Sequence, residues 1–371
     1  MVDLTSYEEI IIWGASFPPT QTEGDATSHG RAIESVADIL RKYGIWENVI
    51  AIVDSNKGLH GRKRLGIEVK DPQFILQHPQ ALVIINTISI WAIEKCMINA
   101  GICNDYVIIP YYFYHGTVEH PYRNDVAKKD AENNKNKIYS LYNVEDELTK
   151  KYLDIILEMR LAGEDKLYEP QYYEGTSKGI AYFCDEELAP KGLVTYIDVG
   201  AYDGNSIEPI NKYYGNRLER IVAFEPDNKS RADLSVYLKE KNLDKKTLVL
   251  PYALGSENKQ IRFSTAGQMG QIDEKGNVIL EQRRFDDLED LHITGEAMVK
   301  MDIEGAEMGA LQGMNRFISD NLPYLAICIY HKESDLCEVA EFIKNINSDY
   351  KLYIRGGWHL ECWAVPKRHF E

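Results

Sequence analysis

Two acidic residues and two glycines share a short segment whose residue types and spacing suit ligand binding. Asp198 lies in an apolar run, Gly200 and Gly204 follow with the spacing Gly-x-x-x-Gly, and Asp203 lies between them. Glycine is needed where the backbone takes a positive φ or where a ligand must come close. A second apolar run ends in Glu225. A strand, a glycine turn, a helix and a strand ending in an acid form a nucleotide-binding unit, in which the acid binds ribose hydroxyls.

The glycine spacing indicates which nucleotide to expect. A dinucleotide site carries Gly-x-Gly-x-x-Gly, which lets a pyrophosphate bind at the helix N-terminus. Here Asp198 and Asp203 would repel a pyrophosphate, and they would suit a cationic ligand such as the sulfonium and ammonium groups of S-adenosylmethionine. We therefore expect S-adenosylmethionine as the cofactor. The alternative is an ordinary tight turn between a strand and a helix.

A second group of polar residues follows two later apolar runs. Asp302 and Glu304 come after the run at 297–301, and His331 comes after the run at 324–329. Carboxyl ends of parallel strands are where ligands bind, and a histidine pKa near 6.5 suits proton removal at neutral pH. Asp302, Glu304 and His331 are the candidate catalytic residues, although Asp302 would equally anchor the cofactor's amino group and a lone histidine is more often structural. Glu307 is expected to complement a helix N-terminus.

A metal site is the competing interpretation of these acids. Asp302, Glu304 and Asp287 are carboxylates of the kind that bind Mg²⁺ and lower the pKa of a hydroxyl. Their spacing is not diagnostic, so we predict no metal ligands, and a divalent metal is allowed but not expected. The six cysteines form no Cys-x-x-Cys pair, which argues against a zinc knuckle.

Four segments, residues 197–204, 224–227, 251–256 and 299–307, together resemble the FkbM family of S-adenosylmethionine-dependent O-methyltransferases. The similarity covers residues 173–366 and implies a class I methyltransferase sheet closed by an antiparallel hairpin. It implies that Glu225 binds ribose and that Asp227 and the backbone at 253–254 lie near adenine. The cofactor-binding candidates are Asp198, Gly200, Ala201, Asp203, Gly204, Asn205, Ser206, Glu225, Pro226, Asp227, Ala253 and Leu254.

The elements that must position these residues belong to an α/β fold. Apolar strands are predicted at 196–199, 220–224, 247–250, 297–301 and 324–329, with an extra strand at 260–264 and a hairpin at 350–355 and 358–365. Helices are predicted to start at Asn205 and to span 230–241. We expect residues 173–371 to form the methyltransferase domain and residues 119–172 a helical linker or cover.

Residues 1–118 have the pattern of a smaller Rossmann-like α/β domain. Strands at 9–13, 49–53, 81–86 and 106–109 alternate with helices at 30–43 and 90–100, which predicts a parallel sheet. The outline is similar to the nucleotide-sugar-binding domain of bacterial sugar N-acetyltransferases, but an insertion at 17–29 breaks the compact glycine turn. Asp54 would hold a ribose or cap a strand end. The alternative is a degenerate domain that dimerises or positions substrate.

Composition limits the partners of the chain. With 42 basic and 58 acidic residues the net charge is −16, and a field of that sign repels nucleic acid and anionic membranes. No apolar run approaches the length of a membrane span, and the N-terminus lacks a basic signal-peptide start. We expect a cytoplasmic protein, with a homo-oligomer left open.

The leading hypothesis is O-methylation of a sugar or sugar-containing metabolite. The acceptor could be a nucleotide sugar used in surface-polysaccharide biosynthesis. One alternative is an inactive protein that binds S-adenosylmethionine or a nucleotide sugar. Another is an NAD(P)-dependent sugar enzyme centred on the N-terminal domain, against which the broken glycine turn argues.

Overall fold

The computed structural model describes residues 4–15, 33–86, 90–108, 125–162, 182–183, 186–266, 269–272, 276, 278–355 and 360–371. The predicted insertion at 17–29 lies outside these residues. The chain divides into two units, one made of Met1–Lys128 with Glu158–Lys178 and the other of Lys129–Leu157 with Gly179–Glu371. Each is described by itself.

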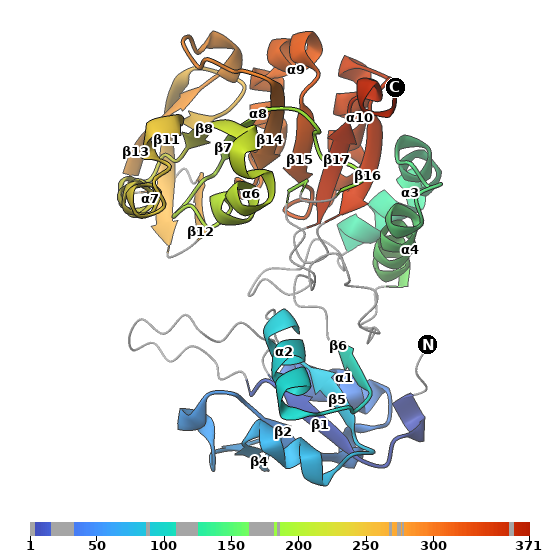
Figure 1. Ribbon diagram of the computed structural model, residues 1–371. Coiled ribbons are helices and arrows are strands. Elements are labelled where there is room, and N and C mark those ends of the chain that lie inside the picture. The colour runs from blue at the N-terminus through green and yellow to red at the C-terminus, as the bar shows by residue number, and fades with distance from the viewer. Residues whose placement is uncertain are drawn as a thin grey trace. The chain divides into compact units, whose positions relative to one another are not determined.

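Unit 1 contains a six-stranded sheet with the strand order β3-β4-β2-β1-β5-β6 (Figure 1). All strand pairs are parallel except β3 with β4. The sheet is therefore mixed, and the predicted parallel pattern holds for its other five strands. The elements of this unit are β1 (Ile10–Trp13), α1 (Ile33–Lys42), β2 (Val49–Val53), β3 (Lys63–Arg64), β4 (Ile67–Lys70), β5 (Leu82–Ile85), α2 (Ile90–Ala100) and β6 (Tyr106–Ile108).

The core of unit 1 follows from its apolar strands. Every residue of β1 and β5 is buried, as is usual for a strand that lies inside a parallel sheet. Helix α1 turns Val36, Ile39 and Leu40 toward this sheet, where they join one hydrophobic cluster with Ile12 and Ile52. The alternation of strands and helices in the sequence thus supplies both the sheet and the helix that packs on it.

Unit 2 is built on a seven-stranded sheet with the order β16-β17-β15-β14-β7-β8-β9. The strands from β15 to β9 are parallel, and β17 pairs antiparallel with both β15 and β16. The strands are β7 (Val194–Val199), β8 (Leu218–Phe224), β9 (Thr247–Leu250), β14 (Glu296–Met301), β15 (Tyr324–Cys328), β16 (Lys351–Arg355) and β17 (Glu361–Val365). The predicted methyltransferase-like sheet with a C-terminal antiparallel hairpin is confirmed.

Helices cover the sheet of unit 2. Side chains of α6 and α7 pack with alternate residues of the strands, among them Tyr196, Met298 and Trp363, in one buried cluster. The helices of this unit are α3 (Asp125–Leu141), α4 (Glu147–Ala162), α6 (Ile207–Tyr214), α7 (Asn228–Glu240), α8 (Glu307–Gly313), α9 (Asn315–Asn321) and α10 (Asp335–Ile346). The first residues of α3 and the last of α4 belong to unit 1.

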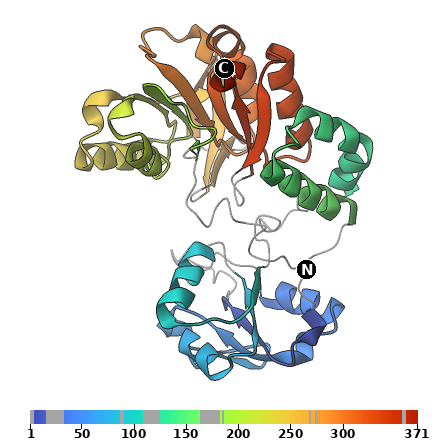
Figure 2. The same ribbon diagram turned by 45° about the vertical axis from the view of Figure 1, so that its right-hand side comes forward.

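The α3–α4 pair lies beside the hairpin strand β16 in both views (Figures 1 and 2). Arg355 on β16 donates two hydrogen bonds to the carboxylate of Asp146, at 2.8 and 3.0 Å, and a third to Thr149. A bidentate pair of this kind stabilises the contact and also fixes the orientation of the two side chains. The helical region predicted as a linker or cover is thus attached to the methyltransferase-like sheet. The tyrosine-rich stretch at 164–175 lies outside the described residues.

A small four-stranded sheet, with the order β10-β13-β11-β12, lies between β9 and β14 in the sequence. It contains β10 (Ala253–Leu254), β11 (Lys259–Ala266), β12 (Met269–Ile272) and β13 (Val278–Arg283). The extra strand at 260–264 was predicted, but the strands that pair with it were not. Ala253 and Leu254 pair with β13 and so leave the main sheet at its edge.

The two large sheets share a strand order. In each, the five parallel strands run third-second-first-fourth-fifth in their order along the chain, as β4-β2-β1-β5-β6 and as β9-β8-β7-β14-β15. In such sheets ligands bind at the carboxyl ends of the strands, where the order reverses. Among the described helices, none is both long and apolar enough to cross a membrane.

Candidate active site

The glycine turn after β7 packs directly against the end of β14. Gly200 has φ +86°, and a Cβ built on it would lie 2.2 Å from the carbonyl oxygen of Asp302. Gly204 has φ +92°, and its Cβ would lie 2.6 Å from a ring carbon of Tyr237. Both positions therefore require glycine for conformation and for space. The turn brings the backbone of 200–204 to the edge of the sheet where a ligand would bind.

Glu225, at the end of β8, closes this turn. Its two carboxylate oxygens accept backbone N–H groups from Tyr202 at 2.8 Å and from Asp227 at 2.9 Å. The side chain is largely buried, and burial raises the pKa of the carboxyl group. A carboxylate has about four lone-pair sites, so two remain for further hydrogen bonds such as those from a ribose.

A buried ion pair lies beneath the turn. Asp198 on β7 and Lys300 on β14 are partners in register, and Lys300 Nζ lies 3.1 Å from Asp198 Oδ1. Ser206 donates to the other carboxylate oxygen, and Lys300 also donates to the carbonyl of Gly200 at 2.6 Å. Although burial opposes the charge of Lys300, Asp198 raises the pKa of its ammonium group. This pair ties the turn to the centre of the sheet.

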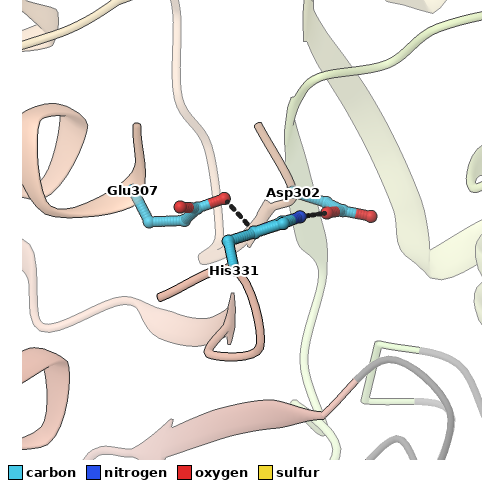
Figure 3. Close-up of side chains that lie close together, drawn as sticks. All are labelled: Asp302, Glu307 and His331. Carbon is cyan, nitrogen blue, oxygen red and sulfur yellow. Dashed lines mark ion pairs between the residues drawn. The ribbon is translucent and has the colours of Figure 1, made fainter. Parts of the chain in front are cut away.

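Four titratable side chains meet at the carboxyl ends of β14 and β15. His331 Nε2 lies 3.6 Å from Asp302 Oδ1 and 3.5 Å from Glu304 Oε2, while His331 Nδ1 lies 3.0 Å from Glu307 Oε1. Figure 3 shows Glu307 and Asp302 on opposite sides of the imidazole ring. Tyr330 donates a hydrogen bond to Asp302 at 3.0 Å. The predicted trio of Asp302, Glu304 and His331 is thus brought together, and Glu307 joins it.

The carboxylates decide the charge of this histidine. Burial alone would lower the pKa of His331, but the hydrogen bond and charge of Glu307, together with the charges of Asp302 and Glu304, raise it to about 9. His331 is therefore mostly protonated at neutral pH. Burial also raises the pKa of Glu304.

The comparisons with known proteins agree with this geometry. Residues 198–350 match the model of the methyltransferase FkbM domain. The chain carries an FkbM methyltransferase domain. It is therefore an S-adenosylmethionine-dependent methyltransferase. A search of curated proteins finds no match.

Solved structures extend the fold comparison. The crystal structure of methyltransferase FkbM from Methylobacillus flagellatus is 19% identical with a TM-score of 0.56, covering 97% of this chain and 90% of that one. An rRNA methylase from Streptococcus thermophilus is 16% identical with a TM-score of 0.29, covering 49% and 89%. The N-terminal domain of human METTL16 in complex with SAH is 16% identical with a TM-score of 0.28, covering 47% and 62%.

The remaining predicted residues of the methyltransferase domain lie at different distances from its turn. Ala201 and Ser206 are buried in it, Asp203 accepts the N–H of Asn205, and Asp227 caps α7 by accepting the N–H of Ser230. Asp198 is completely buried, so it supports the turn through Lys300 and Ser206. Asp287 contacts Asn258 and Arg284 and belongs to a different group of side chains from Asp302.

Sequence reasoning gave no ligand-site role to several residues that the structure places at this site. Lys300 holds Asp198, Tyr330 holds Asp302, and Glu307 contacts His331. The prediction that Glu307 complements a helix N-terminus is only part of its role, because it accepts the N–H of Ile303 and also faces His331. A lysine inside an apolar strand was the available signal, since a buried charge needs a partner.

Proposed function

We propose that this chain transfers the methyl group of S-adenosylmethionine to a hydroxyl of a sugar or sugar-containing metabolite. The observation that carries the proposal is the position of Asp302, whose backbone touches the glycine turn and whose side chain joins His331 and Glu304. The cofactor supplies a methyl group already activated on a sulfonium. The protein must hold the acceptor in line with it and take the hydroxyl proton.

Charge at the site supports a hydroxyl-bearing acceptor. Asp302, Glu304 and Glu307 place three carboxylates around one imidazole, which disfavours an anionic group at this point. Ionised carboxylates accept hydrogen bonds only, and several hydroxyls of a sugar would supply the donors. The carboxylate side chain of Glu304 is 36% exposed, so it can reach a ligand.

In this proposal Asp302 is the general base that accepts the proton of the acceptor hydroxyl. Its side chain is 19% exposed and is oriented by the Tyr330 hydroxyl. Protonated His331 lies between Asp302 and Glu304 and stabilises both negative charges, and Glu304 contacts the acceptor. General-base catalysis of this kind contributes about 10²–10⁴-fold.

On the cofactor side, Glu225 binds the ribose hydroxyls with the lone pairs that Tyr202 and Asp227 leave free. The backbone at Gly200–Gly204 borders the methionine end, where the buried Asp198–Lys300 pair fixes it. Pro226, Asp227, Ala253 and Leu254 lie on the adenine side.

We also propose that unit 1, taken by itself, binds a nucleotide or nucleotide sugar. Asp54 follows β2 as Glu225 follows β8, and it too accepts two backbone N–H groups. The segment that borders it is basic in an otherwise acidic chain, with Lys57, Arg62 and Lys70. Basic side chains beside a ribose-binding acid suit phosphate groups.

The test combines turnover with binding. The purified full chain is given S-adenosylmethionine and a panel of nucleotide sugars, and release of S-adenosylhomocysteine is measured. Once an acceptor is found, Asp302→Ala should reduce turnover at least tenfold while calorimetric binding of S-adenosylhomocysteine is kept, because Asp302 acts on the acceptor. Asp287→Asn is the matched control, and near-wild-type turnover of Asp302→Ala would remove Asp302 from the mechanism.

A further inference from the structure

We propose that Glu307 is a positioning residue, which fixes the ring of His331 and the turn that carries the proposed general base. Glu307 is the first residue of α8, and its side chain is only 1% exposed. It therefore acts on the acceptor through its neighbours rather than by contact. The proposal rests on the proposed function for the place of the acceptor and for the role of Asp302.

One carboxylate oxygen of Glu307 reaches both the histidine and the turn. Its Oε1 lies 3.0 Å from His331 Nδ1 and accepts the backbone N–H of Ile303 at 2.9 Å. It also accepts the N–H of Gly305 at a longer distance of 3.4 Å. Because Asp302 directly precedes Ile303, a single atom ties the general base and the imidazole ring to one point of the fold.

The turn that Glu307 holds has an unusual backbone. Glu304 has φ +55° and Gly305 has φ +91°. A residue other than glycine is uncommon in this left-handed region, and it stays there only where its surroundings hold it. The two N–H groups that Glu307 accepts flank Glu304 in the sequence and supply that support. The carboxylate of Glu304 is thereby kept 3.5 Å from His331 Nε2.

The ring of His331 needs two protons to suit its neighbours. Glu307 lies at Nδ1, whereas Asp302 and Glu304 lie 3.6 and 3.5 Å from Nε2, and Figure 3 shows Glu307 and Asp302 on opposite sides of the ring. A neutral imidazole has one N–H and one lone pair, so one side would then direct a lone pair at a carboxylate. Only the imidazolium form offers an N–H to each side.

Glu307 is the acid that contributes most to keeping this ring charged. Burial lowers the pKa of His331, and Glu307, with smaller contributions from the two acids at Nε2, raises it to about 9. Asp335 on α10 is the other buried acid nearby, and burial together with the charge of Glu307 raises its pKa to about 7. Its carboxylate accepts the backbone N–H of Lys332 at 2.8 Å. Lys300 is held in its own buried ion pair.

The test first reads the charge of His331 in the full chain without turnover. Histidine rings labelled with ¹⁵N are followed by NMR from pH 6 to about pH 11, with signals assigned through the backbone. We expect the wild-type ring to carry both protons at pH 7 and to lose one near pH 9. This measurement does not depend on the folding of any variant. In Glu307→Gln the pKa of His331 should fall by about one pH unit or more, a tenfold loss of proton affinity. Asp287→Asn is the matched control and should leave it unchanged.

Turnover gives a second readout once an acceptor is known. The wild-type kcat should fall at high pH as His331 loses its proton, because Asp302 and Glu304 then face a ring without an N–H at Nε2. In Glu307→Gln this fall should begin at lower pH, displaced by the same amount as the pKa measured by NMR. A merely structural role would lower turnover equally at every pH.

A wild-type ring that is neutral at pH 7 overturns the positioning role. So does a His331 pKa that Glu307→Gln leaves unchanged, or a loss of turnover that is equal at every pH. The proposed function fails in a different way. If Glu307→Gln lowers the pKa of His331 but no hydroxyl-bearing acceptor is methylated, only the proposed function is rejected. If such an acceptor is methylated while the pKa of His331 does not respond to Glu307, only the positioning role is rejected.

Discussion

The two large sheets of this chain share one backbone arrangement in their parallel strands. Gly14 follows the first strand of unit 1 with φ +116°, as Gly200 follows the first strand of the other sheet with φ +86°. A Cβ on Gly14 would lie 2.4 Å from the carbonyl oxygen of Asn86, and one on Gly200 would lie 2.2 Å from that of Asp302. In both sheets the turn after the first strand thus contacts the residue that directly follows the fourth of the five parallel strands.

The acid at the end of the second strand repeats as well. Asp54 accepts the N–H of Ala15 at 2.8 Å, and Glu225 accepts that of Tyr202 at 2.8 Å. Each also accepts the backbone N–H of the residue two positions later in the sequence, Asn56 for Asp54 and Asp227 for Glu225. An acid at the end of the second strand therefore has a structural role, because it holds the turn after the first strand by hydrogen bonds, and any ligand binding comes in addition to that role.

What separates the sheets is the pair beneath the turn. Asp198 and Lys300 face each other across β7 and β14, whereas the corresponding partners on β1 and β5 are Ile12 and Ile84. The backbone arrangement is therefore common to both sheets, while the charged pair stands in the methyltransferase domain and is replaced by two isoleucines at the matching positions of unit 1. At these positions unit 1 has two apolar side chains, which carry no charge or hydrogen-bonding group for a sulfonium or an amino group.

The largest effect should come from replacing the charged pair of the methyltransferase domain with the isoleucines that unit 1 has at the matching positions. Asp198→Ile alone leaves Lys300 charged and buried, which should lower the free energy of unfolding by about 3–5 kcal/mol. The combined change of Asp198→Ile, Lys300→Ile and Ser206→Ala should restore stability near that of the wild type, since apolar replacement of a buried pair is often neutral. It should also reduce affinity for S-adenosylhomocysteine at least 100-fold.

Urea unfolding followed by circular dichroism and calorimetric titration measure the two effects separately. The combined change in unit 1, Ile12→Val with Ile84→Val, is the control that should leave cofactor binding intact. Wild-type affinity in the triple variant would mean that the pair is a structural feature only, and the contrast between the sheets would lose its functional meaning.

A smaller effect distinguishes the two acids. Glu225→Ala and Asp54→Ala each remove two hydrogen bonds to backbone N–H groups, so each should destabilise its own unit by about 1–3 kcal/mol. Only Glu225→Ala should weaken binding of S-adenosylhomocysteine, by at least tenfold. Asp54→Ala should instead weaken binding of uridine diphosphate, measured by calorimetry. If Asp54→Ala leaves binding of that nucleotide unchanged, its carboxylate only caps the strand.

Most of the fold was predictable because its strands are apolar runs between clear breaks. The predicted bounds of β2 and β9 agree with the structure at 49–53 and 247–250, and the hairpin agrees to within a few residues. The positions of Asp302 and His331 at neighbouring strand ends also followed from the pattern, since parallel strands bring their carboxyl ends to one edge.

Contacts between distant side chains were not predictable in the same way. Glu307 looked like a residue that complements a helix end, and nothing in its neighbours indicates that it faces His331 across 24 positions of sequence. The small sheet escaped prediction because the apolar run of β13 is only three residues long, Val278–Leu280, and three polar residues follow it. Spacing predicts which strand end a residue occupies, but the direction of its side chain depends on packing.

A further, pH-dependent effect concerns the hairpin β16–β17, which lies beside β15, whereas the described sheet of unit 1 ends at the matching strand, β6. Glu361 on β17 is 3% exposed and accepts the indole N–H of Trp363. Burial raises its pKa from 4.5 to about 8. A pKa that is higher in the folded state contributes stability that is complete below pH 4.5 and lost as pH rises through 8. Glu361→Gln should therefore match the wild type at pH 5 and unfold at a higher temperature at pH 9.

Thermal unfolding at pH 5, 7 and 9 measures this difference. A rise of the pKa from 4.5 to about 8 corresponds to about 5 kcal/mol. Since about 1 kcal/mol shifts Tm by roughly 2–4 °C in a domain of this size, the difference should be about 10 °C or more at pH 9. Glutamine keeps an oxygen for the Trp363 indole, so the comparison isolates ionisation. Glu281→Gln on the exposed face of β13 is the control and should show no change with pH. An equal shift at all three pH values for Glu361→Gln would show that this carboxyl group does not ionise within the folded hairpin, and the pH response of the methyltransferase domain would then have to arise elsewhere.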